Sequence, residues 1–587
     1  MPLPFEDSRR LTGANLYFPV PAAVLETAPG VTLDDDVVTR WRANVERLRR
    51  ELGWPEAPAA ARLHEGRGSL AIAAAADQLF TATEVNEWAL CKALPASVAG
   101  DDPFHAPAYP ALWDDELASK TLRLAAAGER RPDLLALRDE AHRRGLAVLF
   151  DDTELTLGEG SASRSWPLDA LPSPGSVDWP ALHGIPVALV TGSNGKTTTT
   201  RLVAAISERA GRRTALSSTD GVAVGGETIA SGDYSGPAGA RAALRDARAD
   251  AAVLETARGG ILRRGLAVER AQAAIVTNIS ADHFGEYGVH SLDDLADAKL
   301  VVAHALDGGG TLVLNADDAV LVRRSAALAC PIAWFALDAD HRLLAAARAR
   351  GAATCGVRGG ELILHADGIE RPLGRVADMP LSANGAAKYN IANLAGAALV
   401  AHALGLDHTI IAQVFAQFGA RNSDNPGRLM RWRFGAATVL LDYAHNPDGL
   451  QGLLDVARTL SPAGRLAIVL GQAGNREDAD IRELAAVAAR RRPDLVVLKE
   501  LVSFARGRTS GEVVALLRDE LSRNGVAANA MLTSREEIDA ARVALEWARD
   551  GDLLVLPIHD KQGRAEVVAL LEKLAAAGWQ PGKPLPS

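Results

Sequence analysis

A glycine-rich loop followed by lysine and threonine is the first group of residues whose types and spacing suggest chemistry. It lies within VALVTGSNGKTTTTRLVAAI, where we expect a buried strand to end at Val190 and a helix to begin at Lys196. Backbone N–H groups of such a loop, together with a helix N-terminus, bind phosphate oxygens. The sequence therefore predicts a nucleotide site, and its residues are Gly192, Asn194, Gly195, Lys196, Thr197 and Thr198.

Within this loop the side chains have separate tasks. Lys196 is expected to reach the outer phosphates, and the hydroxyl of Thr197 or Thr198 is expected to bind Mg²⁺. The loop departs from the general GxxxxGK[ST] pattern, because Val190 occupies the place of the first glycine. A strand–helix turn that binds no ligand is the competing interpretation.

Short apolar runs that end in polar residues surround the loop in the sequence. Examples are VALVTGSNGK, DAAVLETARGG, AAIVTNISADH and GGTLVLNADD, and helical segments alternate with them. Strands that are apolar throughout indicate a parallel sheet covered on both faces. Ligands of such sheets bind at the carboxyl ends of the strands, so we expect the chemistry among these polar tails.

Changes in this pattern divide the chain of 587 residues into three expected α/β domains. Residues 1–178 form an N-terminal mixed α/β domain that ends in a Gly-, Ser- and Pro-rich stretch. Residues 179–424 form a central P-loop ATPase domain, and residues 425–587 form a C-terminal Rossmann-like domain, in which strand-like runs such as ATVLLDYAHNP and DLLVLPIHDK recur. A helix is expected in the first of these domains, because apolar residues recur there at helical spacing, namely Trp41, Val45, Leu48 and Leu52.

The motifs that follow the loop resemble, in order, those of the Mur ligase superfamily. They are TGSNGKTTT, LETARGGILRRGL, TNISADHFGEYG, LADAKLVV, LVLNADD, KYNIANLAGA, NPGRLMRW and LLDYAHNPDGL. The resemblance implies an ATP-dependent, ADP-forming amide ligase with a magnesium site. It assigns catalysis to Lys196, Glu255, His283 and Lys299, and places the last three with Thr197 at the metal, Lys299 in a position that is carbamylated in many relatives.

The same resemblance implies further nucleotide contacts, from Asn315, Asn390, Asn393, Arg428, Asp442 and His445. Asp442 corresponds to the aspartate that meets the ribose, although an Asp at the end of a strand could instead cap a helix. Taken one at a time, a glutamate, histidine or lysine in these positions is more often a surface or structural residue, and their spacing after the loop supports the assignment.

Three stretches are closer to the cyanophycin synthetase branch of the superfamily than to the peptidoglycan ligases. They are STDGVAVGGETIASGDYSGPAGA, ETARGGILRRGL and FARGRTSGEV. This likeness implies that arginine or lysine is joined to the side chain of an aspartate. The candidate substrate residues are Arg258, Arg506, Arg508 and Glu512, with Glu500 and Asp448 as further carboxylates; a purely structural role is the alternative for each. No loop of an ATP-grasp domain is evident before Asp178.

Composition restricts the partners. The net charge of −10 argues against nucleic acid, and no run of the sequence approaches the length of a membrane span. Three cysteines without CxxC spacing are typical of a reducing cytoplasm. The expected partners are an amino acid and a peptide or polymer acceptor, with a homo-oligomer left open. The alternatives are a partner-dependent ATP-binding subunit, a small-molecule kinase or ATPase, and a folate polyglutamylating ligase.

Overall fold

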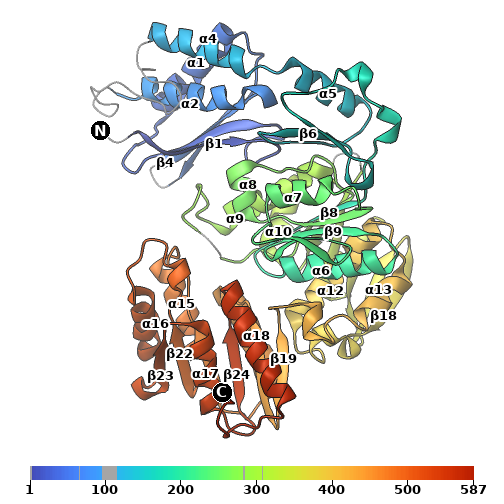
Figure 1. Cartoon of the computed structure of the whole chain (residues 1–587), viewed down its shortest axis with the longest axis vertical. Coiled ribbons are helices and arrows are strands. Elements are labelled where there is room, and N and C mark those ends of the chain that lie inside the picture. The colour runs from blue at the N-terminus through green and yellow to red at the C-terminus, as the bar shows by residue number, and fades with distance from the viewer. Residues whose placement is uncertain (1–2, 65–66, 96–114, 282–283, 307–308, 587) are drawn as a thin grey trace.

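The computed structural model describes residues 3–64, 67–95, 115–281, 284–306 and 309–586, and its elements form four sheets (Figure 1). His283, one of the predicted metal residues, lies outside the described residues. No helix in the described ranges has the length and apolarity that a membrane crossing requires.

An antiparallel sheet of order β1-β2-β4-β3 forms the N-terminal part of the chain. Its strands are β1 (Phe5–Leu11), β2 (Ala22–Thr27), β3 (Ala59–His64) and β4 (Arg67–Ala73). The helices are α1 (Asp35–Leu52), α2 (Leu79–Ala93), α4 (Asp115–Glu129) and α5 (Pro132–Arg143). The helix predicted from Trp41, Val45 and Leu48 is confirmed as α1, and it buries those three side chains.

A small antiparallel sheet follows, made of β5 (Val148–Phe150), β6 (Glu154–Leu157) and β7 (Arg164–Pro167). In the run GLAVLFDD, which indicates a buried strand, the strand begins only at Val148, because Arg144 and Gly145 form the turn that ends α5. This small sheet lies between the N-terminal sheet and the large sheet along the sequence, where the Gly-, Ser- and Pro-rich stretch was noted.

The large central sheet has the order β11-β10-β9-β12-β8-β13-β14-β15-β16-β17-β18. Its strands are β8 (Val187–Thr191), β9 (Thr214–Ser218), β10 (Gly221–Val224), β11 (Glu227–Ser231), β12 (Ala251–Glu255), β13 (Ala273–Val276), β14 (Thr311–Asn315), β15 (Ile332–Asp338), β16 (Thr354–Arg358), β17 (Glu361–Ala366) and β18 (Ile369–Arg375). The expected parallel pairing holds from β9 to β16, whereas β10, β11, β17 and β18 are antiparallel additions at the two edges.

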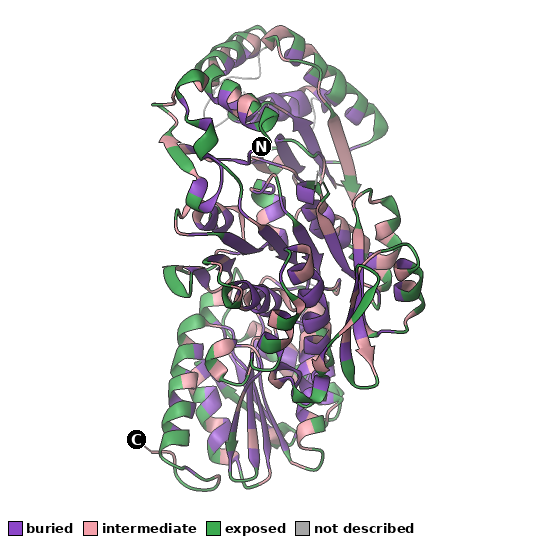
Figure 2. Ribbon diagram, turned by 90° about the vertical axis from the view of Figure 1, so that its right-hand side faces the viewer, coloured by how far each residue is buried: buried purple, intermediate pink, exposed green. Residues whose placement is uncertain are grey.

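Helices cover both faces of this sheet, as predicted. One face packs against α6 (Lys196–Arg209), α12 (Lys388–Ala403) and α13 (His408–Phe415). The other packs against α7 (Pro237–Arg245), α8 (Arg258–Arg264), α9 (Leu292–Leu300), α10 (Ala319–Arg324) and α11 (Arg342–Arg348). Figure 2 shows the resulting layers, with buried strands between helices whose outer sides are exposed.

The C-terminal sheet has the order β19-β20-β24-β21-β22-β23, and only β19 is antiparallel to its neighbour. Its strands are β19 (Met430–Phe434), β20 (Ala437–Asp442), β21 (Leu466–Leu470), β22 (Leu495–Lys499), β23 (Met531–Ser534) and β24 (Leu553–Pro557). One face packs against α14 (Pro447–Leu460), α15 (Asp478–Ala489) and α16 (Glu512–Arg523), and the other against α17 (Glu537–Trp547) and α18 (Lys561–Ala576).

Candidate functional site

The glycine-rich loop joins the end of β8 to the start of α6, as expected from its sequence. Gly195 has a φ of 86°, and a Cβ there would lie 2.3 Å from Oδ1 of Asn393. Gly192 is equally restricted, since its Cβ would lie 1.9 Å from Oγ1 of Thr277. The loop can therefore follow this path only with glycine at both positions, and its backbone leads directly into the N-terminus of α6.

Lys196 begins α6, and its side chain folds back over the loop. Its Nζ donates to the carbonyl oxygens of Gly192 at 3.1 Å and of Ser193 at 3.0 Å. The ammonium thus lies at the mouth of the loop, within reach of anionic oxygens bound there. Its role as the cation of the outer phosphates stays a prediction.

Thr197 and Glu255 form the part of the site that best fits a magnesium ion. The hydroxyl of Thr197 donates to Oε2 of Glu255 at 2.9 Å, and Glu255 is only 1% exposed. Oε1 of Glu255 has no hydrogen-bond partner among the described residues. Burial raises the pKa of this carboxyl group, and nearby Lys196 opposes the rise. A hydroxyl beside a carboxylate with an unused oxygen matches the hard oxygen ligands of Mg²⁺.

Lys299 approaches the same loop from α9. It is buried, and its Nζ donates to the carbonyl oxygen of Gly192 at 2.9 Å. Within the described ranges no three His, Cys, Asp or Glu side chains converge on one metal position. The assignment of Lys299 to the metal, and its carbamylation, remain predictions.

Three asparagines predicted for the nucleotide surround the loop in different ways. Asn390 donates to the carbonyl oxygen of Leu381 at 3.0 Å and accepts from Asn393 at 3.1 Å, so this buried pair supports the side of the loop next to Gly195. Asn315 ends β14 and donates to the carbonyl oxygen of Thr277 at 3.2 Å. The structure therefore brings all three to the loop region.

The C-terminal domain closes the other side of the site. Nη2 of Arg428 lies 3.4 Å from Oγ1 of Thr197, and its guanidinium stacks over the ring of Tyr443 at 4.4 Å. Asn446 donates from Nδ2 to Oδ1 of Asn194 at 3.0 Å. Sequence reasoning missed Asn446, although it lies within the DYAHNP motif. Two sheets that are far apart in the sequence thus meet at the phosphate loop.

Asp442 and His445 lie on the same side but mainly contact their own domain. Asp442 accepts from the backbone N–H groups of Leu429 at 2.6 Å and Ala444 at 2.8 Å, and burial raises its pKa. Nδ1 of His445 lies 3.3 Å from the carbonyl oxygen of Tyr443. Asp442 contacts Leu429, which follows Arg428, and His445 contacts Tyr443, over which Arg428 stacks. Both residues therefore border the site that Arg428 enters.

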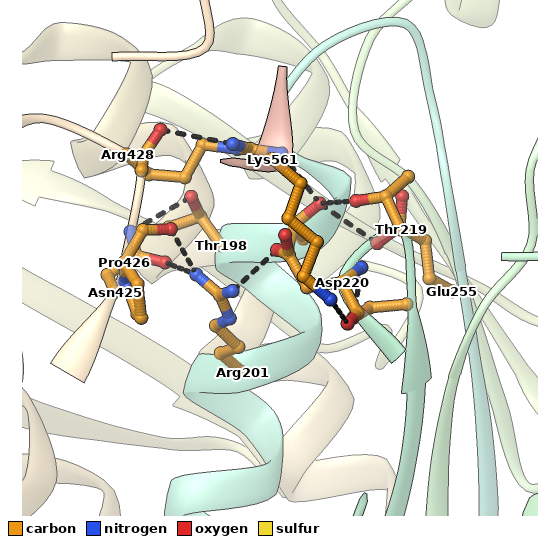
Figure 3. Close-up of polar contacts among 12 residues, drawn as sticks. Thr198, Arg201, Thr219, Asp220, Glu255, Asn425, Pro426, Arg428 and Lys561 are labelled. Atoms are coloured by element: carbon orange, nitrogen blue, oxygen red, sulfur yellow. Dashed lines mark hydrogen bonds and ion pairs between the residues drawn. The ribbon is translucent and has the colours of Figure 1, made fainter. Parts of the chain in front are cut away.

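A group of charged side chains that the sequence analysis did not identify joins the two domains beside α6 (Figure 3). Arg201 donates to Asn425 at 3.0 Å, to the carbonyl oxygen of Pro426 at 2.9 Å and to Asp220 at 2.6 Å. Asp220 also pairs with Arg564, and its carbonyl oxygen accepts from Lys561 at 3.1 Å. The only available signal was the position of Arg201 on the phosphate-loop helix. Asp220 lies 19 positions away along the chain, but Asn425 and Pro426 lie more than 200 positions away.

The predicted substrate residues occupy two places. Arg258 begins α8, is buried, and donates to Oε2 of Glu286 at 2.6 Å. Glu286 in turn accepts from Asn475 of the C-terminal domain at 3.4 Å. Arg258 therefore lies where the central and C-terminal domains face each other on the Glu255 side of the sheet.

Arg506 and Arg508 lie in the loop that precedes α16, and Glu512 is the first residue of that helix. Arg508 donates to Glu512 at 2.7 Å, to Asp478 at 2.7 Å and to the carbonyl oxygens of Gly474 and Arg476. It also lines a pocket with Gln472, Lys499, Glu500, Leu501, Ala505, Thr509, Gly511, Val513, Val514 and Gly474. Arg506 lies next to this pocket residue Ala505, with its guanidinium 5.8 Å from the ring of Phe504. Arg508 thus orders the loop, which agrees with the purely structural role considered for it above. It also faces the pocket.

Comparison with known proteins supports the assignment of both α/β units. Residues 190–401 match the family described as "Mur ligase middle domain", and residues 427–557 match "Mur ligase, glutamate ligase domain". The chain is 34% identical over 374 residues to the cyanophycin synthetase of Synechocystis sp., covering 63% of this chain and 42% of that protein. It is 36% identical over 378 residues to the cyanophycin synthetase of Trichormus variabilis, covering 63% and 41%.

A second kind of ligase matches the chain at lower identity. The UDP-N-acetylmuramoyl-L-alanyl-D-glutamate–2,6-diaminopimelate ligase of Chlorobaculum tepidum is 28% identical over 387 residues, which cover 62% of this chain and 70% of that protein. The chain spans about two fifths of the length of the cyanophycin synthetases it matches. The chain is more similar to the cyanophycin synthetases than to this ligase, as the three stretches of sequence predicted.

Proposed function

Because the chain belongs to the Mur ligase superfamily, we propose that it is an ATP-dependent ligase that joins the amine of an amino acid to the carboxylate of an acceptor. The observation that carries the proposal is the pair Thr197–Glu255 beside Lys196 at the start of α6. It places a hydroxyl, a carboxylate with an unused oxygen and an ammonium at the mouth of one phosphate loop.

In the proposed reaction the acceptor carboxylate attacks the γ-phosphorus of ATP. The bond to the β–γ bridging oxygen breaks, so ADP leaves and an acyl phosphate forms. The amine then attacks the carbonyl carbon, the carbon–oxygen bond to phosphate breaks, and the nitrogen loses a proton. Bound Mg²⁺ supplies charge neutralisation on the phosphates during the first step.

The residues of the chain bind and orient the reactants. Loop N–H groups and Lys196 hold the phosphates, and Arg428 reaches toward Thr197 from the C-terminal domain. Arg258 is buried on the acceptor side, where a guanidinium can orient an anionic acyl group. Holding nucleotide, carboxylate and amine together supplies most of the rate enhancement in such a ligase.

For the substrates, we propose arginine or lysine as the amine and the side chain of an aspartate as the acceptor. The identity to cyanophycin synthetases supports this choice, as does the resemblance of the segment FARGRTSGEV to that branch. The pocket lined by Arg508 and Glu500 is the proposed place of the amino acid. Glu500 can pair with a basic side chain, and Arg508 would exchange its bond to Asp478 or Glu512 for one to the α-carboxylate. The N-terminal domain, residues 1–178, is proposed to contribute to the acceptor side.

The test is phosphate release from Mg²⁺-ATP, scanned over single amino acids with and without peptides that contain aspartate. Lys196→Ala serves as the blank, and mass spectrometry identifies the conjugate. We expect release to require one amine and one acceptor. Release that is independent of both, or no release with any pair despite tight ATP binding, would refute the proposal.

A further inference from the structure

The N-terminal sheet presents a row of polar residues to the segment 284–294 of the central domain. Arg62 and His64 come from β3, and Arg9 comes from β1 on the same face of the sheet. The guanidinium of Arg9 lies 4.5 Å from the ring centre of Tyr287, and its Nε donates to the carbonyl oxygen of Leu262 at 2.7 Å. This row therefore lies directly against residues that follow the predicted metal residue His283 in the sequence.

His64 packs against the tight turn of this segment. Its ring lies 5.2 Å from the ring of His290, and a Cβ on Gly288 would lie 2.7 Å from its Cδ2. Its Nε2 lies 3.2 Å from Oγ of Ser69, so the ring is also anchored in its own sheet. The turn is closed by the backbone bond from the N–H of Gly285 to the carbonyl oxygen of Val289 at 3.0 Å. His64 thus fills the space that the turn leaves.

Arg62 holds the beginning of α9. It forms an ion pair with Asp294, the residue that accepts from the backbone N–H groups of His290 at 3.0 Å and Ser291 at 2.9 Å. Asp294 and Ser291 form a capping box, which fixes the start of the helix. The ion pair therefore ties the N-terminal sheet to the helix that carries Lys299.

The held segment and the helix that it begins both contact groups that the proposed reaction uses. Glu286 accepts from Arg258 at 2.6 Å, and Lys299 at the far end of α9 donates to Gly192 in the phosphate loop at 2.9 Å. A shift of the segment would displace Arg258 on the acceptor side and the loop on the nucleotide side. Misplacement by about 1 Å in such a site can cost ~10²-fold in rate.

We propose that Arg62 and His64 are positioning residues, through which the N-terminal domain holds segment 284–294 in the geometry that the reaction needs. The proposal rests on the ligase function proposed above. Neither residue touches a reacting group, so both act through Glu286 and Lys299. The N-terminal domain is by this inference part of the active-site framework in addition to any part in acceptor binding.

The test compares Arg62→Ala, His64→Ala and Arg62→Lys in the full chain. The matched control is Arg67→Ala on the neighbouring strand, because Arg67 forms an exposed pair with Glu6 at 3.1 Å. We expect Arg62→Ala and His64→Ala to lower kcat by ~10-fold or more, with little change in the KM for ATP. Arg62→Lys, which keeps the charge, should recover most of the loss, and Arg67→Ala should behave as wild type.

Amide hydrogen exchange of residues 284–294, measured without substrates, provides the second readout. It should be faster in Arg62→Ala and His64→Ala than in wild type and Arg67→Ala. Unchanged exchange would overturn the positioning proposal even if the wild-type chain showed no ligase activity. Failure of this proposal can therefore be distinguished from failure of the proposed ligase function. Faster exchange with an unchanged kcat in an active enzyme would also overturn it.

Discussion

Glu255 has a carboxylate whose charge serves the proposed reaction but destabilises the fold when no cation is bound. It is 1% exposed, and its Oε1 lacks a partner among the described residues. Replacement by glutamine keeps the shape and the bond from Thr197 but removes the charge. We expect Glu255→Gln to stabilise the protein without Mg²⁺ and to lower turnover by ~10²-fold or more.

The size of the stability change follows from the environment. An unsatisfied buried polar atom costs about 1–3 kcal/mol, and more if it is charged. Glutamine leaves a neutral atom unsatisfied and loses the attraction of Lys196, so a net gain of ~1 kcal/mol remains. That gain corresponds to a Tm rise of ~2–4 °C for a cooperative unit of about 150–250 residues.

The pH dependence has a definite sign. The folded pKa of Glu255 is raised by burial, so the folded state holds its proton more strongly than the unfolded state. The associated stability is present below the unfolded pKa and is lost as pH rises through the folded pKa. The difference in Tm between Glu255→Gln and wild type should therefore grow with pH.

Thermal unfolding in EDTA at several pH values measures the change in stability of Glu255→Gln. Mg²⁺-dependent phosphate release measures its loss of turnover. Turnover should fall ~10²-fold or more, since charge stabilisation by the ion is worth several kcal/mol. Excess Mg²⁺-ATP should raise the Tm of wild type more than that of the variant. If Glu255→Gln were less stable than wild type in EDTA, the reasoning would be refuted, because it holds that the charge of Glu255 binds a cation and lowers stability when no cation is bound.

Four further variants test other parts of the structure. Lys196→Ala should abolish ATP turnover, because the outer phosphates lose their cation, and retained turnover would show that the site lies elsewhere. Asn446→Ala removes a bond to Asn194 worth about 1 kcal/mol, so the KM for ATP should rise ~5-fold; an unchanged KM would contradict this contact. Asp220→Asn should loosen the contact between the two domains and raise the radius of gyration measured by small-angle scattering, because Arg201 and Arg564 lose their shared carboxylate; an unchanged radius of gyration would contradict it. Burial raises the pKa of Glu159 to about 8, so wild-type stability should fall as pH rises toward that value, and Glu159→Gln should flatten the Tm profile.

Local sequence predicted the phosphate loop and the central sheet well. Gly192, Gly195 and Lys196 are recognisable because loop, strand and helix are contiguous, and the predicted residues Glu255 and Asn315 each end a strand of the parallel core. The edges of that sheet were not predicted as antiparallel. The signal was present in ELILHA and IERPLGR, which carry charged residues and are only partly buried, unlike the fully apolar parallel strands.

Contacts between distant segments could not be predicted from one sequence. Asp220 and Arg564 are separated by 344 positions, and Arg9 and Leu262 by 253. The N-terminal helix α2 was also missed, because nearly all of its residues are buried and no apolar stripe marks one face. Its glutamates Glu84 and Glu87 are buried, whereas their charge would lead one to predict that they lie on the surface.

The bonds between Arg201 and the linker residues Asn425 and Pro426 attach the start of the C-terminal domain to the phosphate-binding helix itself. Asn425 also donates to Thr198 at 3.1 Å, so this attachment lies at the first turn of that helix. If the C-terminal domain turned about the linker, atoms near the linker would move least and distant atoms most. The contact between Asn475 and Glu286 would then break before the contacts at the phosphate loop, so the Arg258 side of the site would open first.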